Sequence, residues 1–191
     1  IGDDYTDALV ERIQTSLKAL ADQGVKIFFM HGNRDFLMGD VFANACGADM
    51  LAEGTVITVG DQQVLLMHGD SLCTRDVAYM NMRQLFRNPE WQADLLSKSI
   101  EERLAIGQQV RSESKAGQQM KADDIMDVTP EEVDKVMDDA KVNLLIHGHT
   151  HRPATHDWEF NGQERQRIVL GDWGDDHGWL IRWDEGSSPV L

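Results

Sequence analysis

The sequence predicts a β-rich layered α/β fold with a helical insertion. Three apolar runs, over 25–30, 64–67 and 142–146, each end in a Gly turn that carries His, Asn or Asp. The long stretch between the second and third of these turns, over 76–140, has helical periodicity and little strand character. In open α/β sheets, ligands bind beyond the carboxyl ends of the strands. We therefore expect the three turns to meet at one polar centre.

The elements before the insertion alternate between helix and strand. In chain order we expect a helix capped by Thr6 and ended by Gly24, a strand over 25–30, a helix over 36–45, and strands over 55–59 and 63–67 that flank the hairpin signal Gly60-Asp61-Gln62.

The insertion and the elements after it follow the same logic. In chain order we expect a helix break at Asn88-Pro89, a polar, weakly structured and flexible stretch over 112–119, a helix start at Thr129-Pro130, a strand over 142–146, strands over 154–160 and 165–170 joined across Asn161-Gly162, and a last strand over 179–183.

Composition limits the class of protein. A chain of 191 residues with 41% hydrophobic residues is long enough for one domain with a sizeable core. The net charge of −15 argues against a nucleic-acid partner. Two cysteines, Cys46 and Cys73, make no disulfide framework and indicate a reducing compartment. No apolar run approaches the roughly 20 residues of a membrane-spanning helix, so we expect a protein that does not span the membrane.

The histidines after the strands are candidate metal ligands. His149 and His151 alternate in the turn after an apolar strand, and His68 follows another such strand. Neutral imidazole is the commonest metal ligand in proteins. His147 and His31 precede their glycines and are expected in supporting or core positions. The two remaining histidines, His156 and His177, are expected at the surface.

The three turns together resemble the calcineurin-like metallophosphoesterases. The resemblance rests on H-G-N-R-D-F-L at 31–37, H-G-D at 68–70, I-H-G-H-T-H-R-P at 146–153 and V-L-G-D-W at 169–173. It covers nearly the whole chain and implies a β-sandwich flanked by helices. The family begins with a strand into D-x-H and a second strand into G-D, and neither motif opens this chain. We therefore expect that the first β-α-β unit is missing and that the dinuclear site is incomplete.

The resemblance also implies roles for residues. Asn33, with a neutral carbonyl oxygen, would bind one metal together with His68, His149 and His151; its alternative role is turn formation. This donor set suits two Mn²⁺ ions better than a thiolate zinc site. Arg34 stands where many relatives have His, and its fork can clamp a phosphate, although a surface ion pair with Asp35 is the alternative. The implied catalytic residues are Asn33, Arg34 and His149.

The implied reaction is hydrolysis of the diphosphate of UDP-2,3-diacylglucosamine in lipid A biosynthesis. Metal-activated water would attack the α-phosphorus and give UMP and 2,3-diacylglucosamine 1-phosphate. The domain would span 1–191, with a helical lid over about 76–128. The implied substrate contacts are Asn33, Arg34, Asp76, Tyr79, Ser114, Gln118, Lys121 and His149.

The apolar faces of the insertion allow two interpretations, since they can enclose acyl chains or form helix–helix core. The resemblance further implies a peripheral monomer on the cytoplasmic face of the inner membrane of a Gram-negative bacterium. Two other functions stay open: another dinuclear-metal phosphodiesterase or nucleotide phosphatase, and a non-catalytic scaffold with this fold.

Overall fold

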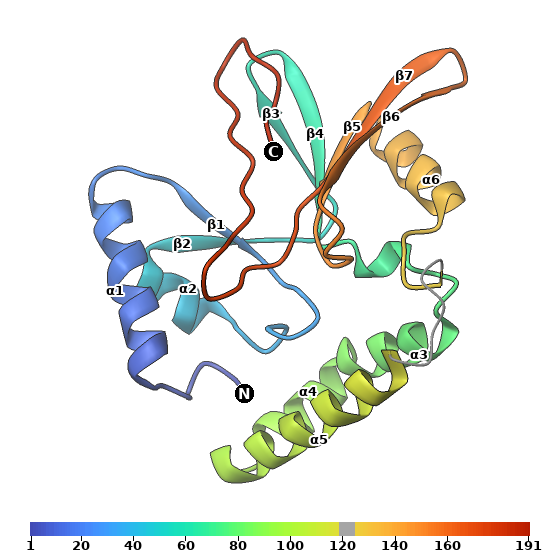
Figure 1. Ribbon diagram of the computed structural model, residues 1–191. Coiled ribbons are helices and arrows are strands. Elements are labelled where there is room, and N and C mark those ends of the chain that lie inside the picture. The colour runs from blue at the N-terminus through green and yellow to red at the C-terminus, as the bar shows by residue number, and fades with distance from the viewer. Residues whose placement is uncertain (119–124) are drawn as a thin grey trace. The chain divides into compact units, whose positions relative to one another are not determined.

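A computed structural model describes residues 1–118 and 125–191 (Figure 1). The chain divides into two compact units. Unit 1 comprises Ile1–Ala52 and Ala78–Ala122, and unit 2 comprises Glu53–Val77 and Asp123–Leu191. Helices and strands occur in both, which confirms the predicted mixed α/β class. The β-sandwich arrangement stays a prediction.

Unit 1 contains a two-stranded parallel sheet and most of the helices. In chain order its elements are α1 (Ala8–Asp22), β1 (Ile27–Met30), α2 (Asp40–Cys46), β2 (Ala48–Leu51), α3 (Val77–Phe86), whose first residue belongs to unit 2, α4 (Pro89–Leu96) and α5 (Ile100–Gln118).

The cap of α1 and the first residue of α2 differ from the predicted ones. Asp7, not Thr6, caps α1, because its extended backbone lets the carboxylate accept hydrogen bonds from the N–H groups of Leu9 (2.9 Å) and Val10 (2.8 Å). The helix predicted from residue 36 begins only at Asp40. Asp3 accepts from the backbone N–H groups near its start, and residues 31–39 form a loop instead.

Strand β2 was not predicted. Gly47 ends α2 with φ of 67°, and Ala48–Leu51 then pairs in parallel with β1. The short polar–apolar run Ala48-Asp49-Met50-Leu51 has no strong strand signal of its own. Its pairing with β1 decides its conformation.

The insertion confirms the break at Asn88-Pro89 and corrects another prediction. Asn88 caps α4, and Pro89 occupies the first turn. Helix α5 runs on through Gln118, so the expected weak structure is wrong for residues 112–118; Gln119 lies outside the described residues. Polar residues such as Arg, Glu, Lys and Gln are good helix formers. Low hydrophobicity was therefore not evidence against a helix.

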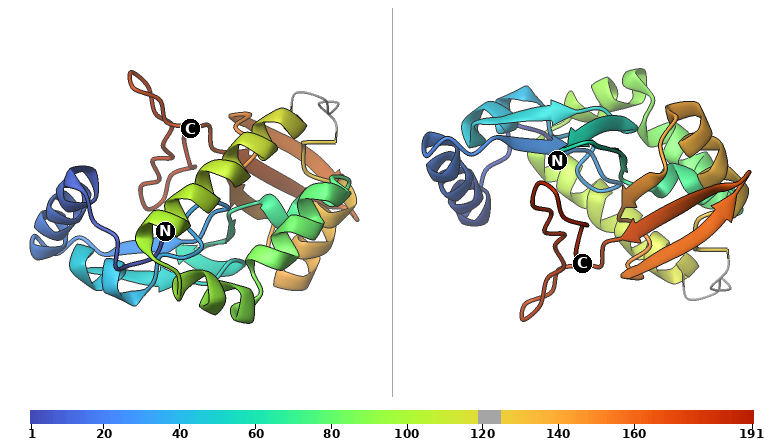
Figure 2. Two further views of the ribbon diagram at one scale, coloured as in Figure 1. Left: turned by 90° about the horizontal axis from the view of Figure 1, so that it is seen from below. Right: turned by 90° about the horizontal axis from the view of Figure 1, so that it is seen from above.

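Unit 2 is built on a five-stranded mixed sheet. Its strand order is β3-β4-β5-β7-β6, with parallel pairing of β4 with β5 and of β5 with β7. The hairpins β3–β4 and β6–β7 confirm both predicted turns, and Figure 2 shows the second hairpin from two sides. Its elements are β3 (Thr55–Val59), β4 (Gln62–Met67), the 3₁₀ turn η1 (Asp70–Leu72), α6 (Pro130–Ala140), β5 (Leu144–His147), β6 (Ala154–Phe160) and β7 (Gln163–Val169).

The two faces of this sheet are covered differently. On one face, Val133 and Met137 of α6 pack against Leu65 and Leu145. On the other, the partly buried residues Ile181, Trp183 and Leu191 of the C-terminal segment pack against Val64, Leu144 and Ile168. Neighbouring strand residues therefore serve opposite cores, as the alternation of side chains along a strand requires.

The predicted strand over 179–183 is wrong. In this segment the structure has an isolated bridge between Arg182 and Val190. The chain reverses at Asp184, whose carbonyl accepts from the Ser187 N–H at 3.0 Å. The apolar side chains that suggested a strand cover the sheet without pairing with it.

Replacing the cap of α1 tests its assignment. We expect Asp7→Ala to lower the free energy of unfolding by about 1 kcal/mol, because two N–H groups of the first turn lose their acceptor. Thr6→Ala should change it by only a few tenths of a kcal/mol. Urea denaturation followed by circular dichroism measures both; a larger effect at Thr6 would contradict the assignment.

Candidate functional site

Two histidine turns lie side by side at the carboxyl ends of the parallel strands β4 and β5 in the unit 2 sheet. Strands β4 and β5 are parallel, and Met67 pairs with His147. Because both strands end at the same level, the next residues also meet: the Gly148 N–H donates to the His68 carbonyl at 3.0 Å. The rings of His68 and His149 lie edge to face, with centroids 5.0 Å apart. The structure thus brings together two of the predicted metal ligands.

His151, the third predicted histidine ligand, lies in the same turn as His149, and both have an unusual backbone conformation. His149 has φ of 66° and His151 has φ of 53°, in the left-handed region that residues other than Gly rarely adopt. Such conformations persist where surrounding contacts hold them, and they cluster at functional sites. The side chain of His151 is exposed.

Gly69 is required by close packing in the first turn. It has φ of 103°, and a Cβ there would lie 2.7 Å from Nδ1 of His147. The next residue, Asp70, is 1% exposed. Gly69 therefore lets the two turns approach each other, with the Asp70 carboxylate and the His147 imidazole buried between them and the core.

Burial keeps the central imidazoles neutral. It lowers the pKa of His149 to about 4, and the neighbouring His68 acts in the same direction. It also lowers the pKa of His147 to about 4. A metal ligand must be the neutral imidazole, so His149 needs no deprotonation to bind a cation near neutral pH.

His147 is a supporting residue, as predicted. Its Nδ1 lies 2.9 Å from the Gly148 carbonyl, and its Nε2 lies 3.4 Å from Nη1 of Arg167. The carbonyl can only accept and the guanidinium can only donate, so these contacts fit a neutral ring protonated at Nδ1. His147 is 1% exposed, so its buried ring supports the turn that follows it.

The donors in unit 2 fit a divalent cation in type but do not complete its coordination. His68 and His149 offer imidazole nitrogen donors, and their rings lie edge to face. Among the described residues, no three His, Cys, Asp or Glu side chains gather closely enough to hold a metal by themselves. The predicted set also includes Asn33, whose amide oxygen is a further type of donor.

Asn33 and Arg34 lie in the loop after β1 in unit 1. The N–H of Gly32 donates to the carboxylate of Asp35, and the Gly32 carbonyl accepts from Arg87 at 3.1 Å. Arg34 is exposed, and the described residues include no ion pair between it and Asp35. The loop is fixed by its neighbours, while the guanidinium of Arg34 points to solvent.

An aromatic cluster in unit 1 was missed by sequence reasoning. Phe36 stacks on Phe86 of α3 with centroids 5.3 Å apart, and Trp91 of α4 lies 5.0 Å from Phe86. Arg87 lies 6.0 Å from the centre of the Phe36 ring. The cluster anchors the insertion to the loop that carries Asn33. An aromatic directly after H-G-N-R-D was the available signal, but it was assigned to a helix.

Sequence comparison places this geometry in a known family. A family model described as calcineurin-like phosphoesterase matches residues 1–153. The chain belongs to the calcineurin-like phosphoesterase family. Members typically hold two metal ions, which agrees with the donor chemistry of the histidine turns.

The phosphoesterase has relatives that share about half of its residues. A UDP-2,3-diacylglucosamine hydrolase of Chromohalobacter salexigens is 50% identical over 191 residues, which cover 100% of this chain and 78% of the relative. The protein of the same name from Cellvibrio japonicus is 52% identical over 181 residues, 95% of this chain and 75% of the relative. That of Pseudomonas aeruginosa is 50% identical over 184 residues, 96% of this chain and 76% of the relative.

Five of the predicted substrate-binding residues of the phosphoesterase lie in the insertion. Asp76 is buried just before α3, and Tyr79 is half-buried within it. Ser114 and Gln118 lie on α5 without described side chains, and Lys121 lies outside the described residues. These assignments stay predictions.

Apolar residues of the insertion divide between the two interpretations given above. Leu95 is 7% exposed and belongs to the core. Leu85, Leu96 and Ile100 are 49%, 41% and 36% exposed. The exposed members leave apolar surface on the insertion. Among the described residues, no helix is both long and apolar enough to span a membrane.

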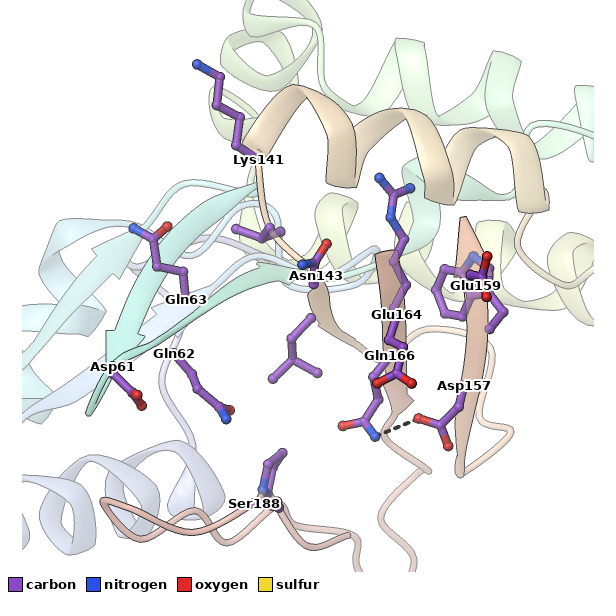
Figure 3. Close-up of a pocket in the computed structure, with 15 residues that line it drawn as sticks. Asp61, Gln62, Gln63, Lys141, Asn143, Asp157, Glu159, Glu164, Gln166 and Ser188 are labelled. Atoms are coloured by element: carbon purple, nitrogen blue, oxygen red, sulfur yellow. Dashed lines mark hydrogen bonds between the residues drawn. The ribbon is translucent and has the colours of Figure 1, made fainter. Parts of the chain in front are cut away.

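An open pocket lies at the opposite end of the parallel strands of the unit 2 sheet. It is lined by residues at the starts of β4, β5 and β7, whose ends carry or adjoin the histidine turns. Figure 3 shows its amide and carboxylate side chains, including the hydrogen bond of 2.7 Å from Gln166 to Asp157. The parallel strands thus separate this pocket from the histidine turns of the phosphoesterase.

Both cysteines of the phosphoesterase are free and buried. Burial raises the pKa of the Cys73 thiol to about 12, and the Asp127 carboxylate adds to this shift. The thiolate form is therefore scarce, and Cys73 is a core residue.

The pKa of His147 makes the stability of the metal-free protein depend on pH. As pH falls from about 6.5 to 4, the unfolded chain binds a proton at this position and the folded chain does not. We expect a loss of up to about 3 kcal/mol in the free energy of unfolding. His147→Asn, which keeps a donor for the Gly148 carbonyl, should flatten this dependence when both proteins are unfolded by urea in a chelating buffer. Parallel pH profiles would contradict the shift.

Proposed function

We propose that this phosphoesterase hydrolyses the diphosphate bond of UDP-2,3-diacylglucosamine in lipid A biosynthesis. The similarity to proteins named for this activity, about 50% identical over essentially the whole chain, carries the proposal. The H-G-N-R-D and G-H-T-H turns support it, because they present nitrogen, amide and guanidinium groups suited to a metal and a phosphate.

The proposed products are UMP and 2,3-diacylglucosamine 1-phosphate. Water attacks the α-phosphorus, and the bond from this phosphorus to the bridging oxygen breaks. The bridging oxygen leaves with the sugar phosphate, while the oxygen of water stays on UMP. Charge develops on the leaving phosphate, and the guanidinium of Arg34, placed beside this phosphate, would stabilise such charge more than it stabilises the substrate.

Asn33, His68, His149 and His151 are the proposed metal ligands, for two Mn²⁺ ions. Such ions, when bound, polarise phosphoryl oxygens and lower the pKa of water. The chain contributes the neutral imidazole of His149, since the low pKa of this residue leaves its ring nitrogen available to a cation. Arg34 is exposed, and its loop is held by hydrogen bonds of the Gly32 N–H to Asp35 and of the Gly32 carbonyl to Arg87. That arrangement allows its fork to bind a phosphate without rearrangement of the backbone.

The proposed domain spans residues 1–191. Its helical insertion, residues 76–128, is the proposed lid over the acyl chains of the substrate. The exposed Leu85, Leu96 and Ile100 give it apolar surface, and the aromatic cluster of Phe36, Phe86 and Trp91 holds its base to the loop with Arg34. The proposed contacts with substrate are Asp76, Tyr79, Ser114, Gln118 and Lys121, together with Asn33, Arg34 and His149.

An acylated substrate also suggests where the enzyme works. We propose a monomer bound peripherally to the cytoplasmic face of the inner membrane. The organisms of the relatives are Gram-negative bacteria, and the substrate's acyl chains reside in a lipid surface. Basic residues of the insertion would meet anionic lipid headgroups.

UMP release tests the proposed reaction. With detergent-dispersed UDP-2,3-diacylglucosamine and Mn²⁺, we expect release that is lost in His149→Ala, because a ligand is removed. His177→Ala is the matched control, since this exposed histidine should leave the rate unchanged. Hydrolysis of a simple aryl phosphodiester without UMP release would instead indicate another phosphodiesterase, and inactivity on both would indicate a scaffold.

The role of Arg34 is tested separately. We expect Arg34→Ala to lower kcat by about a hundredfold or more, as removal of a donor to a developing charge does. Bound Mn²⁺, measured by elemental analysis, should stay at the wild-type level. Arg12→Ala removes an exposed arginine of α1 and serves as the control. An unchanged kcat in Arg34→Ala would rule out the phosphate role.

A further inference from the structure

A series of polar side-chain contacts connects the two ends of the turn that carries His149 and His151. Oδ2 of Asp127 accepts a hydrogen bond from Nη1 of Arg152 at 3.2 Å, and Oδ1 lies 3.9 Å from Nη1 of Arg167. The same Arg167 nitrogen donates to Nε2 of His147 at 3.4 Å. Asp127 is therefore connected to the residue before the turn and to the residue after it.

The geometry of the turn explains why it needs such a contact. Two histidines hold positive φ values that cost free energy of order 1–3 kcal/mol each. Inside the turn, the backbone contributes the bonds from Gly148 N–H to the His68 carbonyl and from Thr150 N–H to the Gly148 carbonyl, at 3.0 and 2.8 Å. These bonds fix the first half. The Arg152 side chain fixes the second half through Asp127.

The segment with Asp127 is itself firmly held. Oδ1 of Asp127 accepts from the Val128 N–H at 2.7 Å. The Thr129 N–H donates to the Leu72 carbonyl at 2.8 Å, and its hydroxyl accepts from Thr74 at 2.8 Å. Val128 and Thr129 are buried. The Asp127 carboxylate therefore belongs to a backbone segment that hydrogen bonds and burial hold in place, near the start of the second segment of unit 2.

We propose that Asp127 is a positioning residue for the histidine turn. Its carboxylate, through Arg152 and Arg167, holds both ends of the strained backbone, so that His149 and His151 keep the orientation that metal binding requires. It acts through the turn and does not itself touch substrate. That the positioned histidines serve phosphate hydrolysis rests on the function proposed above; the contact itself does not.

Amide hydrogen exchange tests the contact without reference to activity. In Asp127→Asn the side chain keeps its shape and loses its charge, and we expect exchange in residues 147–152 to accelerate at least severalfold. Asp139→Asn is the matched control, because it breaks the exposed pair of Asp139 with Lys135 on α6. Equal exchange in the two variants would overturn the proposal.

Kinetics then separate positioning from general stability. We expect Asp127→Asn to lower kcat or Mn²⁺ affinity severalfold, less than the about tenfold to hundredfold lost with a direct partner of a metal ligand, because Asp127 acts through Arg152 and Arg167. KM for UDP-2,3-diacylglucosamine should stay within about twofold, and Asp127→Glu should restore part of the loss. Unchanged kcat and Mn²⁺ affinity in Asp127→Asn would overturn the proposal. If the wild type releases no UMP, the proposed function fails, while the exchange result still decides whether Asp127 holds the turn.

Discussion

The parallel pairing of β4 with β5 is the constraint on which the candidate site depends. Met67 opposite His147 sets the register, and the turns that follow then share a hydrogen bond from Gly148 to His68. Parallel neighbours cannot be joined by a tight turn, so a long connection must run from the end of one strand to the start of the next. Here that connection contains α3 to α6, and part of it belongs to unit 1.

The α6 face of the sheet combines apolar packing with buried charge. Arg165 of β7 is 4% exposed, pairs with Asp134 and Asp138 of α6, and stacks over Phe160. Trp158 donates to the same Asp134 at 3.0 Å. Such a network adds little net stability compared with apolar packing, but breaking it leaves a buried charge unpaired. It therefore specifies how α6 lies on the strands that support the site.

Much of this could be read from the sequence, and the failures have physical causes. The strands that end at Met30, Met67 and His147 and both hairpin turns were predicted, because apolar runs and Gly-containing turns are local signals. The start of α2, the strand β2 and the irregular chain over 179–183 depend on contacts with distant residues. Local pattern also gave His68 and His149 as neighbours. It gave neither Asp127 nor the Phe36 cluster, because those contacts join segments far apart in the chain.

The left-handed backbone at His149 and His151 has a consequence for how variants of this protein behave. Glycine adopts that conformation without steric cost, and asparagine does so more readily than histidine. A chain chosen for thermal resistance alone would therefore carry Gly or Asn at 149 and 151. Under the ligand roles proposed above for His149 and His151, stability and metal binding favour different residues at these two positions, and a screen for heat tolerance alone would select against the proposed ligands.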